Sequence, residues 1–135
     1  MARVLVTGGR TGIGQAVLTQ LIDDGHVAIS TSRHPQPDQA SVEWFTLDLS
    51  KPDSVQAFCN SSFWDKPIDA IFNNAGYGLI APIESASTEA VREQFEANYF
   101  GTMAITQKAM EHFRQKDRGV LVVNTSIGGR MAFPY

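Results

Sequence analysis

The stretch VLVTGGRTGIGQAV, residues 4–17, indicates the fold class of this chain. A short β-branched segment runs into three spaced glycines, and apolar residues at helical spacing follow at once. This order predicts a buried strand, a tight turn and a helix. In such a turn Gly8 permits a positive φ, Gly12 lets a ligand approach the backbone, and Gly14 lets the helix pack closely on the strand. The helix N-terminus then offers N–H groups to a phosphate, although a tight turn without a ligand explains the same glycines.

Outward from this stretch, segments of strand and helix length alternate along the chain. Strands are expected at 3–7, 26–31, 42–47, 68–73 and 120–126. Helices are expected at 12–24, around Val55 and Phe58, and from about 87 to 116, the last either continuous or broken once. This alternation predicts an α/β fold, a doubly wound parallel sheet with helices on both faces and a ligand site beyond the carboxyl ends of the strands. No linker divides the chain, so one domain is expected over residues 1–135.

Composition excludes several functional classes. The 135 residues carry a net charge of −3, and the eleven basic residues are scattered, so we expect neither a nucleic-acid nor a membrane partner. No apolar run approaches the length of about 18 residues that a membrane span needs. The single cysteine, Cys59, excludes an intramolecular disulfide and favours a reducing compartment, the cytoplasm. The three histidines match no metal-ligand spacing, so no metal is expected.

Further motifs follow the glycines in order. The glycine spacing is G-x-x-x-G-x-G, which differs both from G-x-G-x-x-G and from the P-loop of nucleotide triphosphatases. TGGRTGIG is followed by DLS at 48–50, NNAG at 73–76, NYFG at 98–101 and NTS at 124–126. In order and separation this set resembles the motifs of the short-chain dehydrogenase/reductase family, and it covers nearly the whole chain. The resemblance implies a Rossmann-like sheet of about five strands in the order 3-2-1-4-5, without the last strands of the full fold.

The resemblance also implies a nicotinamide dinucleotide cofactor and a set of residues around it. The glycines would carry the pyrophosphate, Asp48 would bind the adenine amino group, and Asn74 with its two successors would line the adenine–ribose side. The cofactor residues expected on this basis are Thr7, Gly8, Arg10, Gly12, Ile13, Gly14, Ser32, Arg33, Asp48, Leu49, Asn74, Ala75 and Gly76. Without the resemblance, Asp48 is as readily a polar residue that closes a strand, and NNAG an ordinary turn.

Two catalytic residues follow from the same resemblance. Ser126 would bind the carbonyl or alcohol oxygen of the substrate and stabilise the charge that develops there. Asn98 would hold a water of the proton relay. Taken alone, Ser126 is a polar loop residue and Asn98 a buried amide satisfied by its helix. We do not assign Tyr77, which follows NNAG, to the site.

The end of the second strand bears on the choice of cofactor. NAD-binding folds place a carboxylate there, but this chain has Ser32 followed by Arg33. A hydroxyl beside a guanidinium suits a 2′-phosphate, and Arg10 could add a second charge, although both arginines could be solvated loop residues. NADP(H) is therefore favoured, and NAD(H) stays open.

The family's general acid/base, a Tyr with a Lys four residues later, would fall beyond residue 135. Tyr135 is not assigned that role, because no Lys follows it. We therefore expect the N-terminal part of an NADP(H)-dependent oxidoreductase acting on a small carbonyl or alcohol, with little or no turnover of its own, since such groups contribute about 10²–10⁴-fold. A non-catalytic dinucleotide-binding or sensor module and a structural fragment are the alternatives. An unprotected strand VLVV and the helix 88–116 predict self-association into a homo-oligomer.

Overall fold

The computed structural model describes residues 1–36 and 41–131. Its five strands all run parallel and form one sheet in the order β3-β2-β1-β4-β5. They are β1 (Arg3–Val6), β2 (Val27–Ser32), β3 (Val42–Thr46), β4 (Ala70–Asn73) and β5 (Val120–Val123). The predicted doubly wound parallel sheet and its strand order are confirmed.

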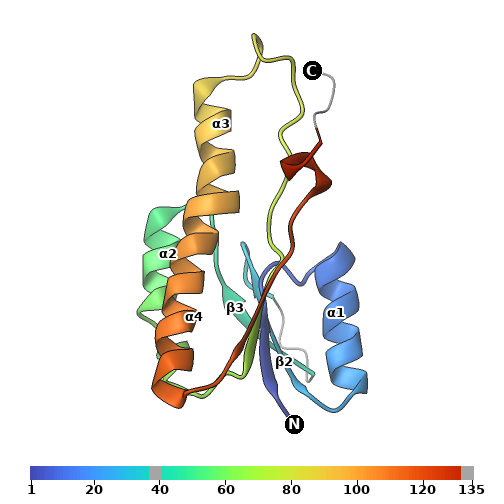
Figure 1. Ribbon diagram of the computed structural model, residues 1–135, viewed down its shortest axis with the longest axis vertical. Helices are drawn as coiled ribbons and strands as arrows, with labels where there is room; N and C mark the ends of the chain where they lie inside the picture. Colours follow the sequence, from blue (N-terminus) through green and yellow to red (C-terminus); the bar gives the residue numbers. More distant parts are fainter. Residues whose placement is uncertain (37–40, 132–135) are drawn as a thin grey trace.

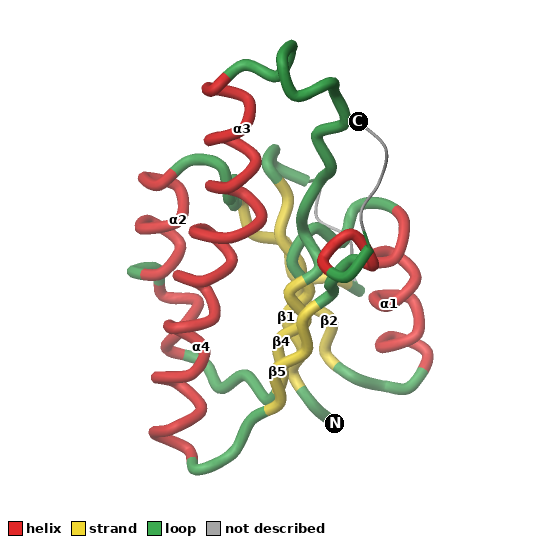
Figure 2. Tube along the Cα trace, turned by 45° about the horizontal axis from the view of Figure 1, so that its top comes forward, coloured by secondary structure: helices red, strands yellow, loops and turns green. Residues whose placement is uncertain are grey.

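Helices cover both faces of the sheet, as predicted (Figure 1). Helix α1 (Gly12–Asp23) lies on one face, and α2 (Pro52–Cys59), α3 (Thr88–Phe95) and α4 (Thr102–Lys116) lie on the other. Figure 2 shows the strands nearly edge-on between these two layers. Two 3-10 turns that the sequence did not predict, Ser62–Asp65 and Ile127–Gly129, complete the described chain.

The long helix predicted between 87 and 116 is broken once, by a π-helical turn over Glu96–Gly101. The hydroxyl of Thr102 donates to the Ala97 carbonyl at 3.2 Å within this wide turn. The turn passes close to the segment after β3, where a Cβ added to Gly101 would overlap the carbonyl oxygen of Leu49. Because of this turn, Asn98 faces the segment that follows β4.

The core has two parts, one on each face of the sheet. Leu5 and Ile71 point towards α2 and α4 and are fully buried with Ile105 of α4. Their strand neighbours point the other way, so Val6 packs with Leu18 of α1. This alternation between successive residues is what a strand buried on both faces requires.

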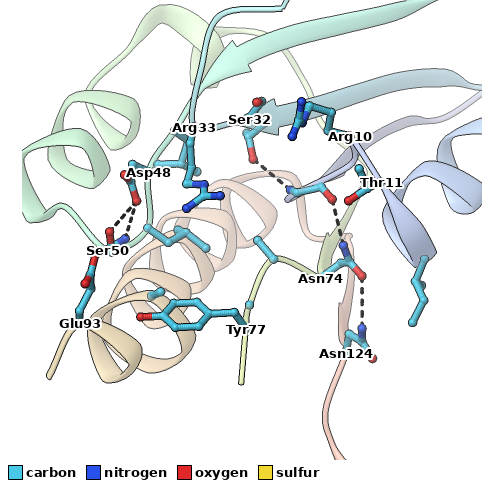
Figure 3. Close-up of a pocket in the computed structure, with 18 residues that line it drawn as sticks. Arg10, Thr11, Ser32, Arg33, Asp48, Ser50, Asn74, Tyr77, Glu93 and Asn124 are labelled. Atoms are coloured by element: carbon cyan, nitrogen blue, oxygen red, sulfur yellow. Dashed lines mark hydrogen bonds between the residues drawn. The ribbon is translucent and has the colours of Figure 1, made fainter. Parts of the chain in front are cut away.

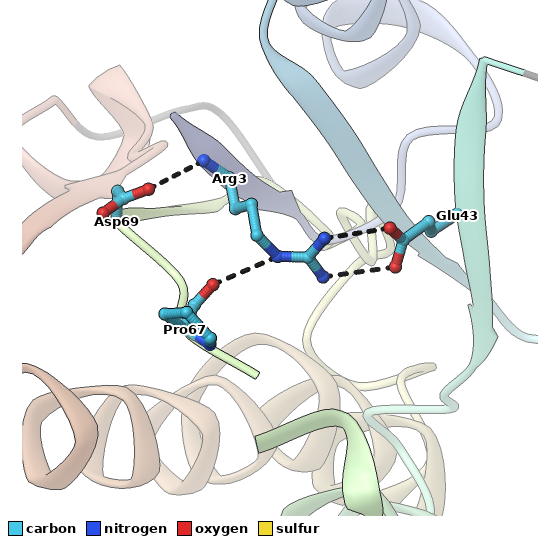
Figure 4. A network of polar contacts seen from close by, with 4 residues as sticks. All are labelled: Arg3, Glu43, Pro67 and Asp69. Carbon is cyan, nitrogen blue, oxygen red and sulfur yellow. Dashed lines mark hydrogen bonds and ion pairs between the residues drawn. The ribbon is translucent and has the colours of Figure 1, made fainter. Parts of the chain in front are cut away.

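A polar network ties the amino ends of the strands together (Figure 4). The guanidinium of Arg3 donates two hydrogen bonds to the carboxylate of Glu43, at 2.9 and 3.2 Å, and one to the Pro67 carbonyl at 3.1 Å. The Arg3 amide donates to Asp69 at 2.9 Å. The hydrogen bonds from Arg3 hold the pKa of the Glu43 carboxyl below its ordinary value. This network lies at the opposite end of the sheet from the carboxyl ends of the strands, where the candidate site is found.

Strand β5 forms an edge of the described sheet. Its side chains Val120–Val123 are between 38% and 55% exposed, which agrees with the unprotected edge expected from the sequence. Among residues 1–36 and 41–131, none of the helices has both the length and the apolar character needed to cross a bilayer.

Candidate functional site

A cavity of about 720 Å³ opens at the carboxyl ends of the strands (Figure 3). The position is the one that the doubly wound topology predicts for a ligand. Most residues assigned to the cofactor from the sequence line this cavity, namely Gly8, Arg10, Ile13, Ser32, Arg33, Asp48, Leu49, Asn74, Ala75 and Gly76.

Other assigned residues do not line the cavity. Thr7 directly follows β1, and Gly12 and Gly14 lie in the first turn of α1. Neither proposed catalytic residue, Asn98 or Ser126, reaches it. The cavity is also lined by residues that sequence reasoning missed, namely Thr11, Thr31, Leu47, Ser50, Tyr77, Glu93, Ala97 and Asn124. Several of these stand in or beside the quoted motifs, but no motif marks Glu93, which the approach of α3 brings to the cavity.

The glycine turn after β1 has the backbone that its sequence predicts. Gly8 has φ +67° and Gly12 φ +58°, in the left-handed region that favours glycine. At Gly14 the constraint is space, because an added Cβ would lie 2.5 Å from the Gly8 carbonyl oxygen and 2.7 Å from Nδ2 of Asn74. The turn and the start of α1 can therefore pack this closely only without a side chain at Gly14.

The N–H groups of the glycine turn and those of the helix N-terminus differ in whether they are free to face a ligand. The Gly8 amide donates to Oγ1 of Thr31 at 3.3 Å, and the Gly9 amide donates to Oγ of Ser30 at 3.0 Å. These two donors are occupied by β2 and do not serve an anion. In the first turn of α1, by contrast, the N-cap residue Thr11 makes no side-chain capping bond. The open donors of the site are thus those of the helix N-terminus, at the positive end of its dipole.

The segment NNAG is fastened to β1 by a compact network. Oγ1 of Thr7 accepts from the amides of Asn74 and Ala75, both at 3.0 Å. Nδ2 of Asn74 donates to the carbonyls of Thr7 and Gly8 at 3.1 and 3.3 Å, and its Oδ1 accepts from Asn124 at 3.2 Å. The Asn74 side chain therefore joins the ends of β1, β4 and β5 and fixes the floor of the cavity.

A basic region lies where β2 ends. Ser32 Oγ accepts from the His34 amide at 3.4 Å and from Nε2 of Gln36 at 3.1 Å. Arg10 and Arg33 are both exposed and line the cavity, and neither forms a salt bridge within the described part of the chain. Figure 3 shows the Arg33 side chain extending into the cavity between Asp48 and the glycine turn. Both guanidinium groups can bind an anion there.

Asp48 lies where β3 ends, at the other side of the cavity. Its Oδ1 accepts from the amide and the hydroxyl of Ser50, at 3.0 and 2.8 Å. Its own amide donates to Ser54 at 3.0 Å. Asp48 thus closes the strand end, which is the role expected for it without the family resemblance. It also lines the cavity, and its second carboxylate oxygen, Oδ2, makes no hydrogen bond to the described residues.

Asn98 and Ser126 make local contacts. Asn98 is exposed, so it is not the buried amide of the alternative interpretation. Its Oδ1 accepts from the Tyr77 amide at 3.0 Å, and its Nδ2 donates to the Tyr77 carbonyl at 2.6 Å. Oγ of Ser126 accepts from the Gly128 amide at 3.1 Å. Tyr135, which was not assigned a role, lies outside the described residues.

Comparisons with known proteins agree with this geometry. The model of the short chain dehydrogenase family matches residues 2–135. An oxidoreductase of Penicillium decumbens, calM, is 39% identical, over 96% of this chain and 47% of its own length. The NADPH-dependent 1-acyldihydroxyacetone phosphate reductase of Saccharomyces cerevisiae is 29% identical, over 97% of this chain and 48% of its own length. The chain therefore belongs to the short-chain dehydrogenase family.

Solved structures share the fold. A short-chain dehydrogenase of Leptospira borgpetersenii with bound NAD+ superposes with a TM-score of 0.86 at 23% identity, over 98% of this chain and 54% of that one. The chain spans about half the length of the curated relatives that it matches.

Proposed function

We propose that this chain is the dinucleotide-binding part of an NADP(H)-dependent oxidoreductase that transfers a hydride between nicotinamide and a carbonyl or secondary alcohol of a small molecule. The observation that carries the proposal is the open first turn of α1, which faces the cavity beside Arg10 and Arg33. A helix N-terminus with two nearby cations attracts a diphosphate. A volume of about 720 Å³ also lies within the range of about 300–1,000 Å³ that is usual for ligand sites.

The residues at the end of β2 favour the phosphorylated cofactor. A carboxylate at this place would accept from the ribose 2′-hydroxyl of NAD and repel a 2′-phosphate. Ser32 carries no charge, and the exposed Arg33 can donate two parallel hydrogen bonds to a phosphate. The yeast relative named as NADPH-dependent supports the same choice.

The proposed catalytic residues keep hydrogen-bonding groups that are not used by the contacts described above. The bound nicotinamide supplies or accepts the hydride. Because Oγ of Ser126 accepts from Gly128, its hydroxyl hydrogen is available to donate to the substrate oxygen. Asn98 uses one donor and one acceptor on Tyr77, which leaves one of each for a water of the proton relay.

Calorimetric titration with NADPH and NADH tests the proposal. We expect NADPH to bind more tightly than NADH. Arg33→Ala should weaken the binding of NADPH by about tenfold or more, because the contact between the guanidinium and the 2′-phosphate is lost. The binding of NADH should change little, because NADH has no 2′-phosphate. Arg92→Ala is the matched control, since Arg92 is exposed on α3 and does not line the cavity. If the wild-type protein bound neither nucleotide, the proposal would be wrong.

We also propose that the chain self-associates. Large apolar side chains gather along the exposed side of α3, the π turn and α4, between 41% and 56% exposed, namely Phe95, Tyr99, Phe100, Met103 and Met110. The β5 edge is a second surface that could pair with another copy. Burial of the helical surface against the same surface of a second copy would remove this apolar area from water.

A further inference from the structure

The cavity is lined by side chains of both charges. Figure 3 shows Arg10 beside Ser32, Arg33 between the glycine turn and Asp48, and Glu93 beyond Asp48. Tyr77 lies on the side of Asp48 and Glu93, and Figure 3 shows its ring directed towards Glu93. Tyr77 is 45% exposed, so its ring is not buried in the core and has surface free to contact a ligand.

The backbone of Tyr77 is held in place by the helical layer. Its amide donates to Asn98 at 3.0 Å, and its carbonyl accepts from Asn98 at 2.6 Å and from Nε2 of Gln94 at 3.1 Å. A few residues further along the chain the loop is freely exposed, with Ile80 86% accessible. Three hydrogen bonds therefore fix the one residue of this loop that carries an aromatic ring into the cavity.

The chemistry of this side of the cavity selects among the parts of a dinucleotide. The carboxylates of Asp48 and Glu93 repel phosphate but accept from an amino group. Leu49 follows Asp48 in the chain, Ala97 lies one helical turn after Glu93, and both add apolar lining to the cavity. A flat, uncharged ring with an exocyclic amino group satisfies all of these neighbours, and a half-exposed aromatic ring stacks on such a base.

We propose that Tyr77 is a cofactor-binding residue, the aromatic wall on which the adenine base stacks. The proposal rests on the proposed function, because it takes the ligand to be a nicotinamide adenine dinucleotide. Gln94 and Asn98 act on the base through Tyr77, as positioning residues. The contribution of Tyr77 lies in its ring and not in its hydroxyl.

Calorimetry with two probes tests this assignment. The probes are NADPH and adenosine 2′,5′-bisphosphate, which contains the base and the 2′-phosphate but no nicotinamide. We expect Tyr77→Phe to bind both as the wild type does, and Tyr77→Leu to lose about tenfold for both, as loss of one base–aromatic stack requires. Tyr99→Leu is the matched control, because Tyr99 is 52% exposed on the π turn and does not line the cavity.

The possible outcomes distinguish a failure of the Tyr77 assignment from a failure of the proposed dinucleotide binding. If Tyr77→Leu bound both probes like the wild type, or weakened NADPH alone, the ring would not contact the base, although the dinucleotide site would stand. If the wild-type protein bound neither probe, the proposed function and this assignment would both fall. Equal losses for the two probes with Tyr77→Leu, and none with Tyr99→Leu, support the assignment.

Discussion

Replacement of Gly14 by alanine tests the packing of the glycine turn. An added Cβ would lie 2.5 Å from the Gly8 carbonyl oxygen, 2.7 Å from Nδ2 of Asn74 and 2.9 Å from Cα of Gly9. Two of these atoms belong to the backbone of the turn, and Asn74 is held by three hydrogen bonds of its side chain. None can retreat without moving the turn, the helix or the floor of the cavity.

The magnitude follows from two opposing effects. Forcing one extra carbon into a packed interior costs about 1–3 kcal/mol. Gly→Ala within a helix ordinarily gains up to about 1 kcal/mol. We therefore expect Gly14→Ala to lower the free energy of unfolding by about 1–2 kcal/mol, a fall of about 3–10 °C in Tm for a domain of this size. The affinity for NADPH falls as well, because the first turn of α1 shifts away from the cavity.

Differential scanning calorimetry and NADPH titration measure both effects. Gly78→Ala is the control, since nothing lies within 4 Å of its added Cβ, and we expect a change within about 0.5 kcal/mol. The sign is the sharpest part of the test, because alanine is the better helix former. A Gly14→Ala protein as stable as the wild type, with unchanged affinity, would refute the reasoning.

Three further predictions concern stability and assembly. The Nε2 atom of His112 accepts from the Ile68 amide at 3.2 Å, and burial, aided by nearby lysines, lowers the pKa of this histidine. The neutral form is thus favoured in the folded state, so its stabilisation is present above the unfolded pKa of about 6.5 and is lost as the pH falls through the lower folded pKa. Urea unfolding of His112→Gln should show a flatter dependence on pH in that window, and an unchanged slope would contradict this. For Glu43, whose pKa is lowered by Arg3, stabilisation is present above about pH 4.5 and is lost on further acidification. Glu43→Gln should lower stability at pH 7 by about 1 kcal/mol or less, since the pair is partly exposed, and should lessen the loss in acid; an acid transition like that of the wild type would count against it. Phe100→Glu, at a side chain that is 54% exposed, should shift the protein towards monomer in light scattering, whereas a wild-type monomer at high concentration would exclude self-association.

The fold could be predicted because its signals are local. The β-branched segment at 3–6, the glycine turn and the apolar spacing from Ile13 to Leu21 specify β1 and α1 within a short stretch, and the alternation of such units implies the parallel sheet. The single break in the long helix was allowed for, but its form was not. At the end of the π turn Gly101 lies so close to the Leu49 backbone that an added Cβ would overlap it, and these two residues are distant in sequence.

The residues of the candidate site that lie in sequence motifs could be predicted. Those that reach the cavity through contacts between distant segments could not. The NNAG and glycine segments carry their own signals, so Asn74 and Gly8 could be placed together. Tyr77 is held at the cavity by hydrogen bonds to Gln94 and Asn98, at sequence separations of 17 and 21 residues. Glu93 reaches the cavity from α3, which is also distant in sequence from the glycine turn. The use of the Gly8 amide by Thr31 is another such contact, and no single-sequence pattern encodes it.

The central claim is that the start of α1 seats a dinucleotide diphosphate. A crystal structure of the protein with NADP+ tests it most directly. We expect diphosphate oxygens about 3 Å from the amide nitrogens of Ile13 and Gly14, with the 2′-phosphate against Arg33. A nucleotide bound elsewhere, or a first turn of α1 that contacts only water while the cofactor is present at saturating concentration, would contradict the account.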